Sequence, residues 1–125
     1  MVEGAIANAE HLALVRKVRD RTRTLISLGD CAVTGNVTAL RNSLGSALPV
    51  LTRVYKEKND LHASIPTAEG ILPPLLDRVT PVHSVVTVDF YIPGCPPPAA
   101  RIRAVLEQLL AGKPLRLEGR EIKFG

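Results

Sequence analysis

Apolar positions at two different spacings divide this chain into alternating strands and helices. A short apolar run, 2–7, opens the chain, and Asn8 is placed to cap the helix that follows. Apolar residues recur there at helical spacing among Arg and Lys, which predicts an amphipathic surface helix. These residues are Leu12, Leu14, Val15 and Val18. A run of residues that favour β structure, 24–28, then ends at Gly29-Asp30-Cys31. This pattern is typical of a buried strand that is followed by a loop at its carboxyl end.

The middle of the chain has weaker periodicity. Residues 32–46 are rich in Gly, Thr, Asn and Ser, so we expect mainly loop with at most one short helical turn. A helix is predicted over 49–58, with Pro49 in its first turn. Residues 59–81 contain four prolines and no sustained period, so they are expected to form an irregular surface excursion with a candidate short helix over 74–78.

The last third of the chain has the clearest pattern. Residues 85–92 are β-branched or aromatic nearly throughout, which predicts a strand covered on both faces by helices. That run ends at Pro93-Gly94-Cys95, and the prolines at 96–98 suit a helix start because they have no amide hydrogens to lose. A strong apolar stripe continues the helix up to Gly112 and Pro114. Its members are Ile102, Val105, Leu106, Leu109 and Leu110. The tail, 115–125, is expected as a short edge strand or as coil.

The alternation of strands and helices predicts a parallel sheet in a three-layer α/β domain. The chain has 125 residues, of which 46% are hydrophobic and 22% charged; this suits one globular domain over 1–125 and excludes a disordered class. Ligands of such sheets bind where the strands end at their carboxyl edge. Both cysteines, Cys31 and Cys95, fall in the first loop after a predicted strand, so the two thiols are expected to be neighbours.

Composition excludes several classes of function. Aromatic residues make up 3% of the chain and Trp is missing, so nucleic-acid binding by base stacking is unsupported. No apolar run approaches the roughly 18 residues of a membrane-spanning helix. Glu3 lies where a signal peptide carries positive charge, so the expected location is the cytoplasm. Walker, G-x-G-x-x-G and G-x-S-x-G motifs are missing from the sequence, which gives no support for nucleotide binding or serine hydrolysis.

The two cysteines admit several interpretations. A buried cysteine is most often a small apolar residue. Here each lies in a Gly-containing loop, and Cys95 precedes a helix, an environment that favours thiolates and iron-sulfur clusters. A cubane cluster usually takes four cysteines, whereas this chain has two. A disulfide is disfavoured in the cytoplasm. Zinc would need two more ligands, and the histidines are expected to be surface or satisfied residues. They are His11, His62 and His83.

Three strings carry a resemblance to a known family: VEGAIAN at 2–8, LGDCAVTGNV at 28–37 and IPGCPPP at 92–98. In this order and spacing they resemble the small subunit of cytoplasmic nickel-iron hydrogenases, most closely that of the NAD-reducing type. The complex I subunit that carries the terminal cluster is a more distant relative. The resemblance covers essentially the whole chain. It implies a flavodoxin-like domain that holds a 4Fe-4S cluster next to the Ni-Fe centre of a separate large subunit.

The resemblance also implies site residues and partners. Cys31 and Cys95 match the third and fourth cluster ligands of the family. Electrons from the large subunit would pass through the cluster to iron-sulfur and flavin diaphorase subunits that bind FMN and NAD. This chain would contain no complete active site of its own. The residues expected around the cluster are Glu3, Gly29, Thr34, Gly35, Gly94 and Pro96.

The sequence departs from the family at its N-terminus. Family members begin with a strand and a C-x-x-C loop that supply the first two cluster ligands, and this sequence starts after that unit. We therefore expect an N-terminally shortened chain, a gap where the central first strand would stand, and no stable cluster in the isolated chain. Two alternatives stay open: a small subunit of another cofactor-reducing or complex-I-like oxidoreductase, and a cluster-free interaction module with two ordinary thiols.

Overall fold

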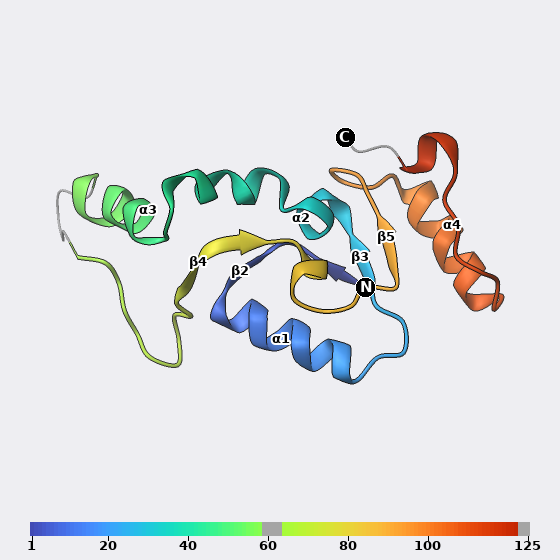
Figure 1. Ribbon diagram of the computed structural model, residues 1–125, viewed down its shortest axis with the longest axis horizontal. Helices are drawn as coiled ribbons and strands as arrows, with labels where there is room; N and C mark the ends of the chain where they lie inside the picture. The colour runs from blue at the N-terminus through green and yellow to red at the C-terminus, as the bar shows by residue number, and fades with distance from the viewer. Residues whose placement is uncertain (59–63, 123–125) are drawn as a thin grey trace.

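The computed structural model describes residues 1–58 and 64–122, in which three parallel strands form the central sheet (Figure 1). These are β1 (Val2–Glu3), β3 (Ile26–Leu28) and β5 (Phe90–Ile92), in the order β1-β3-β5. The predicted parallel α/β sheet is confirmed. β3 pairs directly with β1 on one side and with β5 on the other. The expected gap, at the place of a missing central strand, is therefore wrong for these three strands.

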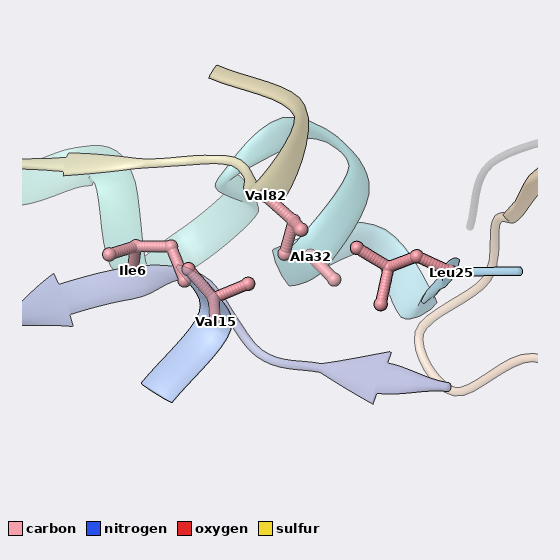
Figure 2. Packing of buried hydrophobic residues seen from close by; sticks show 5 residues of the cluster. All are labelled: Ile6, Val15, Leu25, Ala32 and Val82. Atoms are coloured by element: carbon pink, nitrogen blue, oxygen red, sulfur yellow. The ribbon is translucent and has the colours of Figure 1, made fainter. Parts of the chain in front are cut away.

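Helices cover both faces of this sheet, which gives the three layers that the sequence predicts (Figure 1). Successive residues of a strand point to opposite faces, so Leu25 and Ile26 enter different cores. The first core joins the sheet to α1 (Ala9–Asp20) and α2 (Gly29–Thr34), and Figure 2 shows its buried side chains. They are Ile6, Val15, Leu25, Ala32 and Val82. The second core places α4 (Ala99–Leu110) on the other face through Val105.

Both long helices form where the sequence predicts them. Asn8 caps α1, because its side-chain oxygen accepts a hydrogen bond from the His11 backbone N–H at 2.8 Å. The apolar stripes are only partly buried, however. Val15 is the buried residue of α1, whereas Leu14 is exposed, and at the end of α4 the residue Leu110 is 87% exposed.

The expectation of mainly loop over 32–46 is wrong. The helix α2 is followed by a 3-10 helix, Asn36–Leu44, and Gly35 joins the two in a left-handed conformation with φ 87°. The helix predicted over 49–58 is confirmed, with α3 (Leu48–Thr52) running into a π-helical turn, Arg53–Glu57. Hydrogen bonds from side chains of the 3-10 helix to β4 favour helix over loop here, because they hold its turns in place.

The candidate helix over 74–78 is also wrong, because β4 (Leu75–Thr80) occupies this segment. It pairs antiparallel with β2 (Ile6–Asn8), a partner about seventy residues away in the chain. Residues 59–63 of the predicted surface excursion lie outside the described residues.

The strand predicted over 85–92 is shorter than expected. Only Phe90–Ile92 pair with β3, while Val82–Ser84 form a 3-10 turn. Val82, in that turn, is instead a buried member of the first core, and the valines after it are partly buried against that core. Their apolar side chains therefore leave water without strand pairing. The tail contains a 3-10 helix, Gly119–Ile122, and no strand in its described residues. Within 1–58 and 64–122, every helix is too short or too polar to cross a membrane.

Candidate functional site

The carboxyl ends of β3 and β5 open onto one cavity of 570 Å³, and both cysteines line it. Residues 28–31 form one wall and residues 94–97 form the opposite wall. Glu3 and Gly4, at the end of β1, complete the lining. The three strands of the parallel sheet therefore deliver their carboxyl ends to a single site, as expected for ligand sites in such sheets.

Cys31 lies in the first turn of α2 and not in a loop, which corrects the sequence-based expectation. The cause is Gly29, whose φ of 82° turns the chain directly from β3 into the helix. Within α2, the Thr34 hydroxyl donates to the Asp30 carbonyl at 2.8 Å, and the Gly35 N–H donates to the Cys31 carbonyl at 3.0 Å. The Cys31 thiol is held on a short rigid element and is half-buried.

Cys95 lies in a tightly folded loop between β5 and α4 and is exposed. Gly94 precedes it with φ 138°, and a Cβ at that position would lie 2.5 Å from the Pro97 Cα. Only glycine therefore fits there. On the other side of the loop, the Arg101 guanidinium of α4 donates a hydrogen bond to the Pro93 carbonyl. The backbone around Cys95 is fixed from both directions.

Asp30 is the residue that sequence reasoning missed. It is 7% exposed, and its Oδ1 accepts a hydrogen bond from the Gly94 N–H at 2.6 Å. Its own N–H donates to the Gly94 carbonyl at 2.9 Å. The signal in the sequence is an acidic residue between a strand-ending glycine and a cysteine, but its partner follows only from the pairing of β3 with β5.

The structure separates the predicted surroundings of the thiols into two groups. Glu3, Gly29, Gly94 and Pro96 line the cavity together with the cysteines. Thr34 and Gly35 lie at the opposite end of α2, where they shape the helix and its exit rather than the cavity wall. The cavity is further lined by Gly4, Leu28, Asp30 and Pro97.

The donor set of the cavity suits part of an iron-sulfur site. Both cysteines are free thiols, and thiolates are the usual ligands of iron-sulfur clusters, four to a cubane. In the described part of the chain, three or more Cys, His, Asp or Glu side chains nowhere gather closely enough to hold a metal ion. The described residues therefore offer two thiols that could serve as ligands, and a cubane cluster would need its other ligands from elsewhere.

The histidines do not extend this donor set. His11 lies on α1 beside the Ala7 N–H, and the ring of His83 packs edge-on against Tyr91 with centroids 5.9 Å apart. Neither side chain lines the cavity of the thiols. His62 lies outside the described residues.

Comparisons with known proteins agree with this architecture. The delta subunit of the NAD-reducing hydrogenase HoxS of Cupriavidus necator is 35% identical over 93% of this chain and 56% of its own length. A subunit of the F420-non-reducing hydrogenase of Methanothermobacter marburgensis is 34% identical over 94% of this chain and 38% of its own length. The chain thus spans about half or less of these relatives.

A solved structure has the same fold. A chain in the crystal structure of an NAD+-reducing NiFe hydrogenase in the H2-reduced state superposes with a TM-score of 0.92 at 34% identity. The superposition covers 100% of this chain and 70% of that one. Residues 1–109 match the family described as the 20 kDa subunit of NADH ubiquinone oxidoreductase. Because that match takes in both cysteine segments and all three strands of the parallel sheet, the chain is a member of this 20 kDa subunit family.

Proposed function

We propose that this chain is the electron-transferring small subunit of a nickel-iron hydrogenase, and that Cys31 and Cys95 are two of the four ligands of a 4Fe-4S cluster. One observation carries the proposal: two free thiols, delivered by adjacent parallel strands, line one cavity. Such a cluster, when bound, takes up and passes on single electrons.

The surrounding residues suit that role in three ways. Leu28, Pro96 and Pro97 give the cavity an apolar wall, and limited access of water is one of the factors that tune a cluster's reduction potential. Gly29 and Gly94 carry no side chain, so the backbone can approach a bound group closely. Glu3 adds a carboxylate to the lining, and its negative charge contributes to the electrostatic potential in the cavity.

The other half of the ligand set belongs to the proposal as well. The two missing thiolates come from a C-x-x-C segment outside 1–125, as the family resemblance implies, and 1–125 forms the remainder of one cluster-binding domain. The partners are a large subunit with the Ni-Fe centre and iron-sulfur and flavin subunits that carry FMN and bind NAD. The complex works in the cytoplasm, where thiols stay reduced.

The test uses the native complex, purified without oxygen, with Cys31→Ser or Cys95→Ser in this subunit. We expect each variant to lose iron and the electron paramagnetic resonance signal of this cluster, and to lose hydrogen-dependent NAD reduction almost completely. Ser is nearly isosteric with Cys, so both variants should still fold and co-purify with their partners, and only the stability that the bound cluster contributes should be lost. Asn42→Ala, which breaks two hydrogen bonds to Val79 outside the cavity lining, is the control for general damage.

Two outcomes would contradict parts of the proposal. Intact iron content and electron transfer in both Ser variants would overturn the assignment of the thiols and favour a cluster-free interaction module. A wild-type complex that carries the cluster and oxidises hydrogen with an artificial acceptor, but leaves NAD unreduced, would retain the relay and refute the NAD-linked assignment. The relatives that the sequence matches include both NAD-reducing and F420-non-reducing hydrogenases, so this second measurement is decisive for the acceptor.

A further inference from the structure

Asp30 and Gly94 form a closed pair of hydrogen bonds between the two segments that carry the cysteines. The Gly94 N–H donates to the Asp30 carboxylate at 2.6 Å, and the Asp30 N–H donates to the Gly94 carbonyl at 2.9 Å. Asp30 directly precedes Cys31, and Gly94 directly precedes Cys95. A shift of either backbone segment therefore moves a thiol, and the pair couples the two shifts.

The same arrangement recurs at the opposite end of the same two strands. There the Leu25 N–H donates to the Asp89 carboxylate at 2.7 Å, and the Asp89 N–H donates to the Leu25 carbonyl at 2.9 Å. Each pair joins residues 64 apart, which is the offset of the β3–β5 register. The strand pair is thus clamped at both ends by an aspartate, and only the Asp30 clamp lies in the cavity wall.

Asp30 is also more buried than Asp89, although both make the same pair of hydrogen bonds across the two strands. Its residue is 7% exposed, whereas the side chain of Asp89 is 41% exposed and is paired with Arg19. A buried carboxylate stabilises a fold only when hydrogen bonds replace its lost hydration. Its bond to Gly94 also occupies that amide N–H, so the amide is not available to a sulfur atom.

We propose that Asp30 is a positioning residue that fixes the Cys95 loop relative to Cys31 and thereby sets the geometry and hydrogen bonding of the two thiolates. This inference rests on the proposed function, because it assigns Asp30 a role toward the group that those thiolates hold. Hydrogen bonds to the sulfurs and nearby charge are among the factors that set a cluster's potential. Loss of the clamp should therefore change the cluster's spectrum and potential as well as its retention.

The experiment compares four variants of the native complex. Asp30→Ala removes the carboxylate half of the clamp and leaves the backbone hydrogen bond to the Gly94 carbonyl. Asp30→Asn keeps an acceptor oxygen in the same place, and Asp30→Glu keeps the charge but displaces the acceptor by one methylene. Asp89→Ala breaks the matched clamp at the far end of the strands. Iron content, the paramagnetic resonance line shape of the reduced cluster and its midpoint potential are measured together with the unfolding temperature.

We expect Asp30→Ala to lose at least half of its iron and to show an altered line shape in the cluster that remains. Asp30→Asn should retain full iron and the wild-type line shape. Asp30→Glu should retain iron but shift both line shape and potential, which decides the matter if the Ala variant does not fold. Asp89→Ala should lower the unfolding temperature and leave the spectrum and potential unchanged.

The failures of the two proposals are distinguishable. Wild-type spectrum, potential and iron content in both Asp30→Ala and Asp30→Glu would overturn the role of Asp30 and leave the relay function intact. Equal spectral changes in Asp89→Ala would also overturn it, because the effect would then follow from strand-pair stability alone. A wild-type complex without a cluster in this subunit would instead refute the proposed function itself.

Discussion

Arg19 and Asp89 form an ion pair at 2.6 Å that ties the end of α1 to the start of β5. The same guanidinium donates to the carbonyls of Thr22, Arg23 and Thr87, so one side chain closes the turn between α1 and β3. The Leu25 backbone N–H and the Arg19 guanidinium together hold the pKa of Asp89 below its ordinary value of 3.8, and the backbone hydrogen bond is the larger cause.

This lowered pKa predicts an acid-sensitive contribution to stability. An aspartate whose pKa is lower in the folded state stabilises the fold at pH values above its unfolded pKa. The contribution is lost as the pH falls below 3.8 and through the lower folded value. We expect Asp89→Asn to be less stable than wild type at about pH 6 and the difference to shrink toward about pH 3. Urea unfolding at both pH values measures it, and a constant difference would refute the mechanism.

A second prediction concerns Ser27, in the middle of β3. Its hydroxyl is fully buried and has no hydrogen-bond partner among the described residues. Because an unsatisfied buried hydroxyl is unfavourable, Ser27→Ala should leave the free energy of unfolding unchanged or raise it by about 1 kcal/mol. Asn42→Ala is the contrast, since the Asn42 amide bonds both the N–H and the carbonyl of Val79. It should cost about 1–3 kcal/mol in the same denaturation experiment, and a greater loss for Ser27→Ala would contradict the argument.

A third prediction separates steric crowding from backbone strain at glycine. A Cβ at Gly94 would lie 2.5 Å from the Pro97 Cα and 2.8 Å from the Pro97 nitrogen, both backbone atoms of a fixed loop. Gly112 has φ 63° but nothing within 4 Å of an added Cβ. Gly112→Ala should therefore cost about 1–2 kcal/mol, the cost of the left-handed conformation alone.

Gly94→Ala must also displace the Cys95 loop, so it should cost more and reduce the iron bound by the complex. Chemical denaturation and iron analysis of the two variants side by side test this. Equal stability losses, with iron retained in both, would show that the loop can yield to a side chain.

The sequence indicates the site better than it indicates the surrounding structure. The sequence places Cys31, Cys95 and the glycines beside them just after predicted strands. Because the carboxyl ends of parallel strands lie at the same edge of a sheet, it also predicts that these residues meet, and they line one cavity. The Asp30–Gly94 pair does not follow, since it depends on the register of strands that lie 64 residues apart. Local pattern alone carries no information about that register.

The segments that the sequence misassigns are those decided by distant contacts. The valines of 82–88 have strong β propensity. They pack in or against the first core, however, and this removes their apolar side chains from water without strand pairing. Leu75–Thr80 follows two prolines and lacks a clear period, and it becomes a strand because β2 and the 3-10 helix supply its hydrogen bonds. In both cases tertiary contacts override local preference.

Arg41 provides the test of that last point. Its guanidinium donates to the carbonyls of Ala7, Leu76 and Asp77, and so joins the 3-10 helix to both strands of the β2–β4 pair. Arg41→Ala leaves the partly buried carbonyls of Ala7 and Leu76 without their charged donor, which should cost roughly 2–3 kcal/mol.

Arg41→Lys distinguishes geometry from charge. An ammonium group cannot reproduce the planar fork of a guanidinium, so Lys should recover less than half of the stability lost in the Ala variant. Hydrogen exchange should become faster in both variants at the amides that pair β2 with β4, because that strand pair depends on the Arg41 bridge. Exchange at the amides between β3 and β5 should stay unchanged, because Asp30 and Asp89 hold those strands together independently. Full recovery by Lys would mean that positive charge alone, rather than the bridging geometry, holds β4 in place.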